Sequence, residues 1–259
     1  MRWRVLLLLA ILPLLPGQCP ETRFGGTFIG AVVVEDGIVI ASDSRSTFID
    51  GFGKQFGYID GMPKMFAQEH TAFAVSGLSS VSGELFNSFV ARNDFLLSRP
   101  VDEILFGVML GLPFRNSTKV LLISAGFTNG QPMICAKNPT EPQLCRIEGF
   151  ITNRDSPSLA RWLNSQHGTL PSASDASSAL HQAILESAAG DNTVGGPISV
   201  LYLRKSAKPE WLENPPQDHG WKTVCDIVSD YRRGNARILY TKSKQELEQN
   251  LDKTCPNPR

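Results

Sequence analysis

Two apolar runs joined by a short polar turn constrain the fold of this 259-residue chain more than any other feature. Residues 28–34 read Phe-Ile-Gly-Ala-Val-Val-Val, residues 38–41 read Ile-Val-Ile-Ala, and Glu35-Asp36-Gly37 lies between them. β-branched residues favour strands, and an Asp-Gly pair is typical of a tight hairpin turn. Because neither run alternates with polar residues, we expect a hairpin that is buried on both faces.

The rest of the chain groups its strands and helices in succession. Runs of strands followed by runs of helices favour helices layered on antiparallel sheets over alternating β-α units, so the predicted fold class is α+β. A Pro-rich connector after Lys205 separates a main domain, 27–205, from a C-terminal appendage, 206–259. The hydropathy pattern predicts strands at 72–75, 120–125, 133–135, 145–151, 198–203, 221–231 and 236–240, and helices at 79–98, 101–110, 156–167, 172–189 and 243–251.

The first residues have the pattern of a secretory signal peptide. A basic start, Met1–Arg4, precedes an apolar run at 5–15 that Pro16-Gly17 ends. The apolar run is short for a membrane-spanning helix. We therefore expect a signal peptide at 1–19, a propeptide or linker at 20–26, and a secreted or periplasmic protein. The alternative is an uncleaved anchor, and only then would the protein contact a membrane.

Composition excludes two classes of protein. The 25 Lys and Arg residues balance the 25 Asp and Glu residues, so the formal net charge is zero and no basic excess favours nucleic acid as a partner. With 42% hydrophobic and 19% charged residues, the chain is not typical of disordered proteins.

Four cysteines remain if the segment before residue 27 is removed, and export makes disulfides plausible. Cys135 and Cys145 flank a stretch with two prolines and are expected on facing strands of a hairpin. Cys225 and Cys255 then pair by default, and free buried cysteines are the alternative. The sequence has no Cys-x-x-Cys pair, and its histidines are far apart, so no metal site is predicted.

The sequence Gly25-Gly26-Thr27 offers a nucleophile that needs no histidine. If cleavage exposed Thr27 as a new N-terminus, its α-amine would have a near-neutral pKa and would lie within reach of its own hydroxyl. The amine could then act as the base that activates the hydroxyl. The plainer interpretation is that Gly-Gly-Thr is only the entry to a strand.

Three later residues could complete such a site. Lys64, if buried beside the threonine, would lower the pKa of the hydroxyl, and Asp43 at the end of the second strand could hold that lysine. Gly77 follows the strand at 72–75, and its backbone N–H could approach a substrate oxyanion. Taken singly, each is better explained as a strand end, a surface cation or a turn. Their order and spacing make the functional interpretation competitive.

The stretch 26–45, Gly-Thr-Phe-Ile-Gly-Ala-Val-Val-Val-Glu-Asp-Gly-Ile-Val-Ile-Ala-Ser-Asp-Ser-Arg, resembles the opening of a proteasome β-type subunit. Lys64-Met65-Phe66 through Ser76-Gly77 and the stretch 191–200 resemble later segments of that family, so the likeness covers 27–205. Three features depart from the pattern. Val194 replaces a family serine, with Thr193 beside it. The stretch before Lys64 is longer, and Asn153-Arg154-Asp155-Ser156 stands where a Ser-Gly segment is usual.

The resemblance implies a four-layer α-β-β-α sandwich of the N-terminal-nucleophile (Ntn) hydrolase type. It implies a threonine-type peptidase, in particular an endopeptidase, with Thr27 as nucleophile and base, Lys64 lowering the hydroxyl pKa and Asp43 orienting Lys64. Gly77 would stabilise the oxyanion and Asp191 would support the amine network, with no cofactor. Two alternatives stay open: a catalytically silent secreted scaffold or binding protein, and an exported acylase acting on small amides. A homo-oligomer is possible for each.

Overall fold

The computed structural model describes residues 23–25, 27–77, 79–81, 83–111, 120–166 and 168–256. The expected signal peptide, 1–19, lies outside these residues, as does most of the expected propeptide, 20–26. Across the described ranges the chain forms six α-helices and three larger antiparallel sheets, in agreement with the predicted α+β class.

The hairpin predicted from the two apolar runs lies at the centre of a five-stranded sheet. Its strands are β2 (Ile29–Val34) and β3 (Gly37–Ser42), with Val34 opposite Gly37. β13 (Phe150–Thr152) pairs with β2, β14 (Ser199–Arg204) pairs with β3, and β15 (Glu210–Glu213) lies at the outer edge. This first sheet therefore has the order β13-β2-β3-β14-β15.

A second five-stranded sheet packs against one face of the first. Its order is β12-β11-β10-β7-β6, formed by Leu144–Arg146, Gln131–Lys137, Leu121–Thr128, Thr71–Ser76 and Met65–Gln68. Ile29 and Val33 of β2 face Ala74 and Ile123 of this sheet within one apolar cluster. Val32 and Val34 point the other way into a different cluster. Both faces of β2 are therefore buried, which explains the unbroken apolar run.

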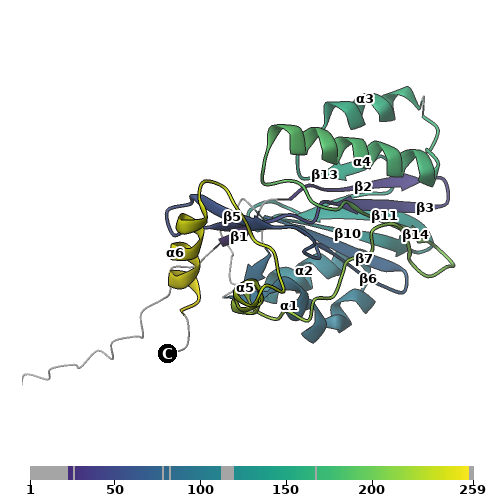
Figure 1. The fold of residues 1–259 in the computed structure, drawn as a ribbon. Helices are drawn as coiled ribbons and strands as arrows, with labels where there is room; N and C mark the ends of the chain where they lie inside the picture. The colour runs from purple at the N-terminus through teal and green to yellow at the C-terminus, as the bar shows by residue number, and fades with distance from the viewer. Residues whose placement is uncertain are drawn as a thin grey trace, which may run out of the picture.

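Helices cover the outer faces of both sheets (Figure 1). α3 (Pro157–Ser165) and α4 (Ala173–Gly190) lie over the first sheet, and Ser156 and Ser172 cap their N-termini through their side chains. α1 (Phe86–Arg92), the 3-10 helix η1 (Asp94–Ser98) and α2 (Val101–Gly111) lie over the second sheet. Among the residues that the structure describes, no helix is both long enough and apolar enough to cross a membrane.

A third sheet joins the N-terminal segment to the C-terminal appendage. Its order is β1-β4-β5-β16, formed by Arg23–Gly25, Ser46–Ile49, Gln55–Ile59 and Leu239–Tyr240. α5 (Val224–Arg233) and α6 (Lys244–Thr254) pack against β4 and β5 through a cluster that includes Phe48, Phe56, Ile227 and Leu247. A small hairpin, β8 (Ser80–Val81) and β9 (Glu84–Leu85), lies beside them.

Three of the expected elements differ in the structure. The strand expected at 221–231 is largely helix α5, because Thr223 and Asp226 form a capping box and Val224, Ile227 and Val228 lie on one buried helical face. The strand expected at 145–151 is divided between β12 and β13, which belong to different sheets. The helix expected at 79–98 begins only at Phe86, after the β8–β9 hairpin.

Both predicted disulfides are present. Cys135 and Cys145 lie opposite each other on β11 and β12, and Cys225 at the start of α5 bonds to Cys255 after α6. The second bond closes the longer loop, with a sequence separation of 30 against 10. Because a crosslink restricts the unfolded chain more when its loop is longer, the second bond is expected to contribute more stability.

Replacing Cys225 and Cys255 together by alanine is expected to lower the free energy of unfolding by about 3 kcal/mol. Denaturant unfolding of the oxidised proteins measures the difference. The control is reductant, which should destabilise the wild type by at least this amount. A double variant as stable as the wild type would contradict the expectation.

Candidate active site

Thr27 lies between β1 and β2 and is almost fully buried, with 1% of its surface exposed. Its position follows from the strand after it, since the apolar residues of β2 bury that strand between the second sheet on one face and α4 on the other. The Thr27 hydroxyl accepts a hydrogen bond from the Lys64 ammonium group. The predicted nucleophile and the predicted lysine are therefore in direct contact.

Lys64 lies in the loop between β5 and β6 and is 2% exposed. Besides the Thr27 hydroxyl, its Nζ atom donates to the carbonyl oxygen of Arg45 at 2.9 Å. Burial lowers the pKa of Lys64 to about 8; the charge of Asp43 opposes this shift and that of Arg154 adds to it. The lysine can thus lose or keep its proton close to neutral pH.

Asp43 ends the β2–β3 hairpin and is completely buried. Its carboxylate accepts three backbone hydrogen bonds, from Phe28 at 2.8 Å, Gly195 at 2.9 Å and Arg45 at 3.2 Å. Burial raises the pKa of Asp43 to about 6, although the Lys64 charge and the three N–H groups favour the ionised form. The charge of Asp43 favours the protonated form of Lys64. Its hydrogen bonds also fix the backbone next to Thr27 and in the loop after α4.

The loop after α4 passes close to Asp43 and Arg45. Gly195 and Gly196 have φ angles of 153° and 74°, in the region that favours glycine. A Cβ atom on Gly195 would lie 2.8 Å from the Arg45 guanidinium carbon. Arg45 is itself held by Asp60, at 2.8 and 3.0 Å, and stacks over Tyr58. The motif Gly195-Gly196 therefore permits this contact between loop and strand end.

The carbonyl oxygen of Thr27 accepts three hydrogen bonds that sequence reasoning missed. Asn153 Nδ2 donates at 2.8 Å, Arg154 Nε at 3.2 Å and the Ser76 hydroxyl at 3.4 Å. Asn153 also accepts the backbone N–H of Ile29 at 2.8 Å. These bonds fix the backbone on both sides of the nucleophile. A polar pair at the end of the short strand β13 carries no sequence signal of its own.

Asp191 contacts this network through Arg154. Asp191 is the C-cap residue of α4. Its carboxylate accepts hydrogen bonds from Arg154 Nη1 at 2.5 Å and from the backbone N–H of Thr193 at 2.8 Å. Burial raises the pKa of Asp191, but the bonds from Thr193 and Arg154 outweigh it, and the net shift is downward. Asp191 thus orients the arginine that contacts Thr27.

Val194, Thr193 and Gly77 are the remaining positions singled out in the sequence, and their surroundings differ. Val194 is 1% exposed and packs among the apolar residues under α4, whereas the Thr193 hydroxyl accepts from Arg154 Nη2 at 3.4 Å. Gly77 follows β7 with a φ angle of 80°, immediately after Ser76. Ser76, the residue before it, contacts the Thr27 carbonyl through its hydroxyl.

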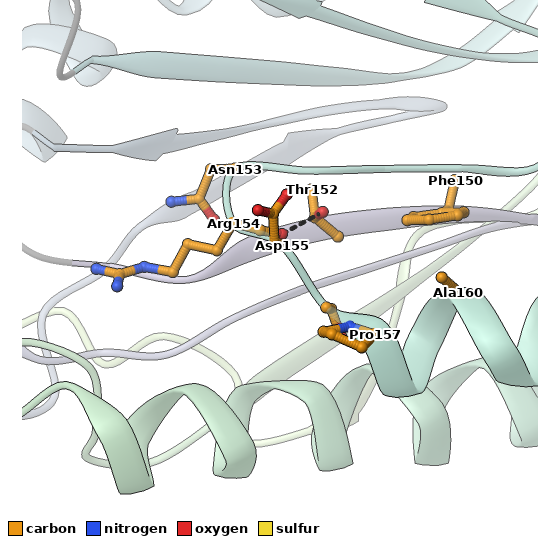
Figure 2. Close-up of a pocket in the computed structure, with 8 residues that line it drawn as sticks. Phe150, Thr152, Asn153, Arg154, Asp155, Pro157 and Ala160 are labelled. Atoms are coloured by element: carbon orange, nitrogen blue, oxygen red, sulfur yellow. Dashed lines mark hydrogen bonds between the residues drawn. The ribbon is translucent and has the colours of Figure 1, made fainter.

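A cavity of about 370 Å³ opens beside the site, between β13 and the start of α3 (Figure 2). Asn153 and Arg154, which contact Thr27, line it together with apolar and polar side chains. In Figure 2, Arg154 and Asn153 extend away from Phe150 and Ala160, which lie at the other end. The other lining residues are Thr152, Asp155, Ser156 and Pro157.

No protein-family model and no curated protein matches this chain. Within the described ranges, no group of three or more His, Cys, Asp or Glu residues is placed to hold a metal ion. The geometry of the site is thus the main observation that bears on function. It combines a buried hydroxyl, a contacting ammonium group of lowered pKa and a buried carboxylate of raised pKa.

Proposed function

We propose that this chain is an Ntn hydrolase of the proteasome β type, which hydrolyses amide bonds with Thr27 after removal of the residues up to Gly26. The observation that carries the proposal is the buried contact between the Lys64 ammonium group and the Thr27 hydroxyl, with Asp43 close enough to act on Lys64. Perturbed pKa values in one buried cluster are typical of functional sites. Helices outside two facing sheets support the proposed four-layer α-β-β-α sandwich.

The proposed reaction transfers an acyl group to Thr27 and then to water. The free α-amine accepts the hydroxyl proton, and Oγ1 attacks the carbonyl carbon of the substrate. The Lys64 charge and the Gly77 N–H stabilise the negative oxygen of the tetrahedral intermediate. The amine returns the proton to the leaving nitrogen as the C–N bond breaks, and water then hydrolyses the ester.

The segment before Thr27 favours a peptide over a small amide as substrate. β1 pairs antiparallel with β4, with Gly25 opposite Thr47 and Arg23 opposite Ile49. These residues form the acyl side of the Gly26–Thr27 bond, so they lie where the acyl side of a substrate would bind. Main-chain pairing of this kind gives affinity for any extended peptide.

We predict that the mature chain begins at Thr27, because an internal threonine has an amide nitrogen with no basic lone pair. Intact-mass measurement of the purified mature protein tests this directly. A chain beginning at Gln18 or Cys19 would contradict the amine-as-base mechanism for that form. Two disulfides support maturation in an oxidising compartment, as a secreted or periplasmic location would provide.

A silent secreted scaffold is the second candidate. Val194 favours it, because this buried valine places no hydroxyl in the network around Thr27. A fluorogenic peptide panel and an electrophile that acylates N-terminal threonine distinguish the two. Turnover together with labelling of Thr27 supports the hydrolase. If a chain that begins at Thr27 shows no turnover and no labelling, the scaffold is supported.

A further inference from the structure

The C-terminal appendage is bonded to the small hairpin that follows Gly77. The N–H of Leu85 donates to the Lys222 carbonyl at 2.7 Å, and the N–H of Val224 donates to the Gly83 carbonyl at 3.0 Å. Asn87 Nδ2 adds a bond to the Trp221 carbonyl at 3.2 Å. We name residues 221–224 the clasp segment. It lies beside β9 as a third strand, through the bridge between Glu84 and Thr223.

The hairpin needs such a neighbour. β8 and β9 have two residues each, and a lone two-stranded hairpin is marginally stable even when it is longer. The clasp segment is itself anchored firmly, because Cys225 bonds to Cys255 and Trp221 and Val224 are buried in the appendage core. The appendage therefore restrains the hairpin through a segment that is itself anchored by a disulfide and by buried side chains.

Ser79, which precedes the hairpin, connects it to two segments near the candidate active site. Ser79 lies two residues after Gly77, and its carbonyl accepts the N–H of Phe86 at 2.9 Å. Its hydroxyl is 2.9 Å from the hydroxyl of Ser46, and both side chains are buried. Ser46 begins β4 and follows Arg45, whose carbonyl accepts Lys64 Nζ.

We propose that the clasp segment is a positioning element for the site, which fixes the backbone at Gly77 and the start of β4. This role rests on the proposed function, since it concerns Gly77 as the donor to the oxyanion and β4 as the strand that binds the acyl side of the substrate. Misplacement of a catalytic group by about 1 Å can cost two orders of magnitude in rate. An appendage that contributes no catalytic residue can therefore still control the rate.

Val224→Pro tests the role with little disturbance of α5. Val224 is the first residue of the helix after the cap Thr223, a position that tolerates proline, and Thr223 has the extended conformation that a following proline requires. The substitution removes the N–H that bonds to Gly83. Val224→Ala keeps that N–H and measures the share of any loss that is due to packing.

The matched control is Lys244→Pro. Lys244 is likewise the first residue of a capped helix, follows Ser243 in extended conformation, and is exposed away from the clasp segment. All chains are produced beginning at Thr27, and kcat and KM are measured on a fluorogenic peptide. Amide hydrogen exchange at Leu85 is followed on the same samples, because it reports the clasp independently of activity.

Val224→Pro is expected to lower kcat about tenfold or more, with KM within about threefold, and to speed exchange at Leu85. Lys244→Pro should match the wild type in all three measurements. Faster exchange at Leu85 with unchanged kcat overturns the positioning role alone, and unchanged exchange overturns the clasp. A wild type without turnover contradicts the proposed function itself, and the positioning role with it.

Discussion

Replacing Thr27 by alanine is expected to abolish amide hydrolysis, with a loss of at least about 10⁴-fold, while the fold stays intact. The hydroxyl oxygen is the attacking atom, so nothing in the site can replace it. Lys64 keeps its bond to the Arg45 carbonyl in the variant, and the cost in stability should be about 1 kcal/mol. The assay is turnover of a fluorogenic peptide, with circular dichroism to follow folding.

The variant must be produced as a chain that already begins at residue 27, because maturation is proposed to use the same hydroxyl. Ser124→Ala is the matched control: it removes another fully buried hydroxyl, one bonded to the Val101 carbonyl at 2.8 Å. Thr27→Ser should retain measurable turnover. Hydrolysis by Thr27→Ala at the wild-type rate would show that the threonine mechanism is wrong and leave the resemblance as a statement about fold.

Replacing Lys64 by methionine is expected to lower kcat/KM by about 10³-fold, or about 4 kcal/mol of transition-state stabilisation. Methionine is similar in length but carries no charge, so both the hydroxyl and the developing oxyanion lose their nearest cation. Lys64→Arg keeps a positive charge in a different shape and should retain part of the activity.

The pH profile gives the sharper readout of Lys64. Asp43, with a pKa of about 6, is ionised above that pH, and Lys64, with a pKa of about 8, is charged below that pH. The wild-type rate should fall above about pH 8 as Lys64 loses its charge. On the acid side it should fall as the α-amine gains a proton near neutral pH, and further below about pH 6 as Asp43 is neutralised. Lys64→Arg should lose the alkaline decline. A wild-type rate in Lys64→Met would contradict the role of the charge.

The central hairpin and the two disulfides were predictable because their signals are local. The unbroken apolar run through Val32 and Val34 predicts burial of the hairpin on both faces. The expected hairpin between Cys135 and Cys145 predicts the first disulfide and leaves Cys225 and Cys255 for the second. The contact of Thr27 with Lys64 was expected from the order of the site residues together with the resemblance. Spacing alone does not bring together two residues that are 37 positions apart.

The contacts that were missed depend on tertiary packing. Asn153 and Arg154 reach the Thr27 carbonyl only because β13 pairs with β2, so their polar side chains looked like an ordinary strand end. The stretch 221–231 has β-branched residues and is expected as a strand, whereas 224–233 form helix α5. The helix is favoured by a capping box at its N-terminus and by an apolar helical face that packs into the core of the appendage.

The place of β1 in the third sheet has a consequence for the matured protein. If the proposed cleavage before Thr27 also releases β1, β4 becomes an edge strand with unpaired main-chain groups, and such edges are templates for aggregation. β4 has four residues, and the opposite side of its partner β5 is closed by β16. On the β4 side the sheet could accept one short strand, and on the other side β16 covers Gly57 and Tyr58 of β5. The short β4 edge would then offer its main chain to one extended peptide.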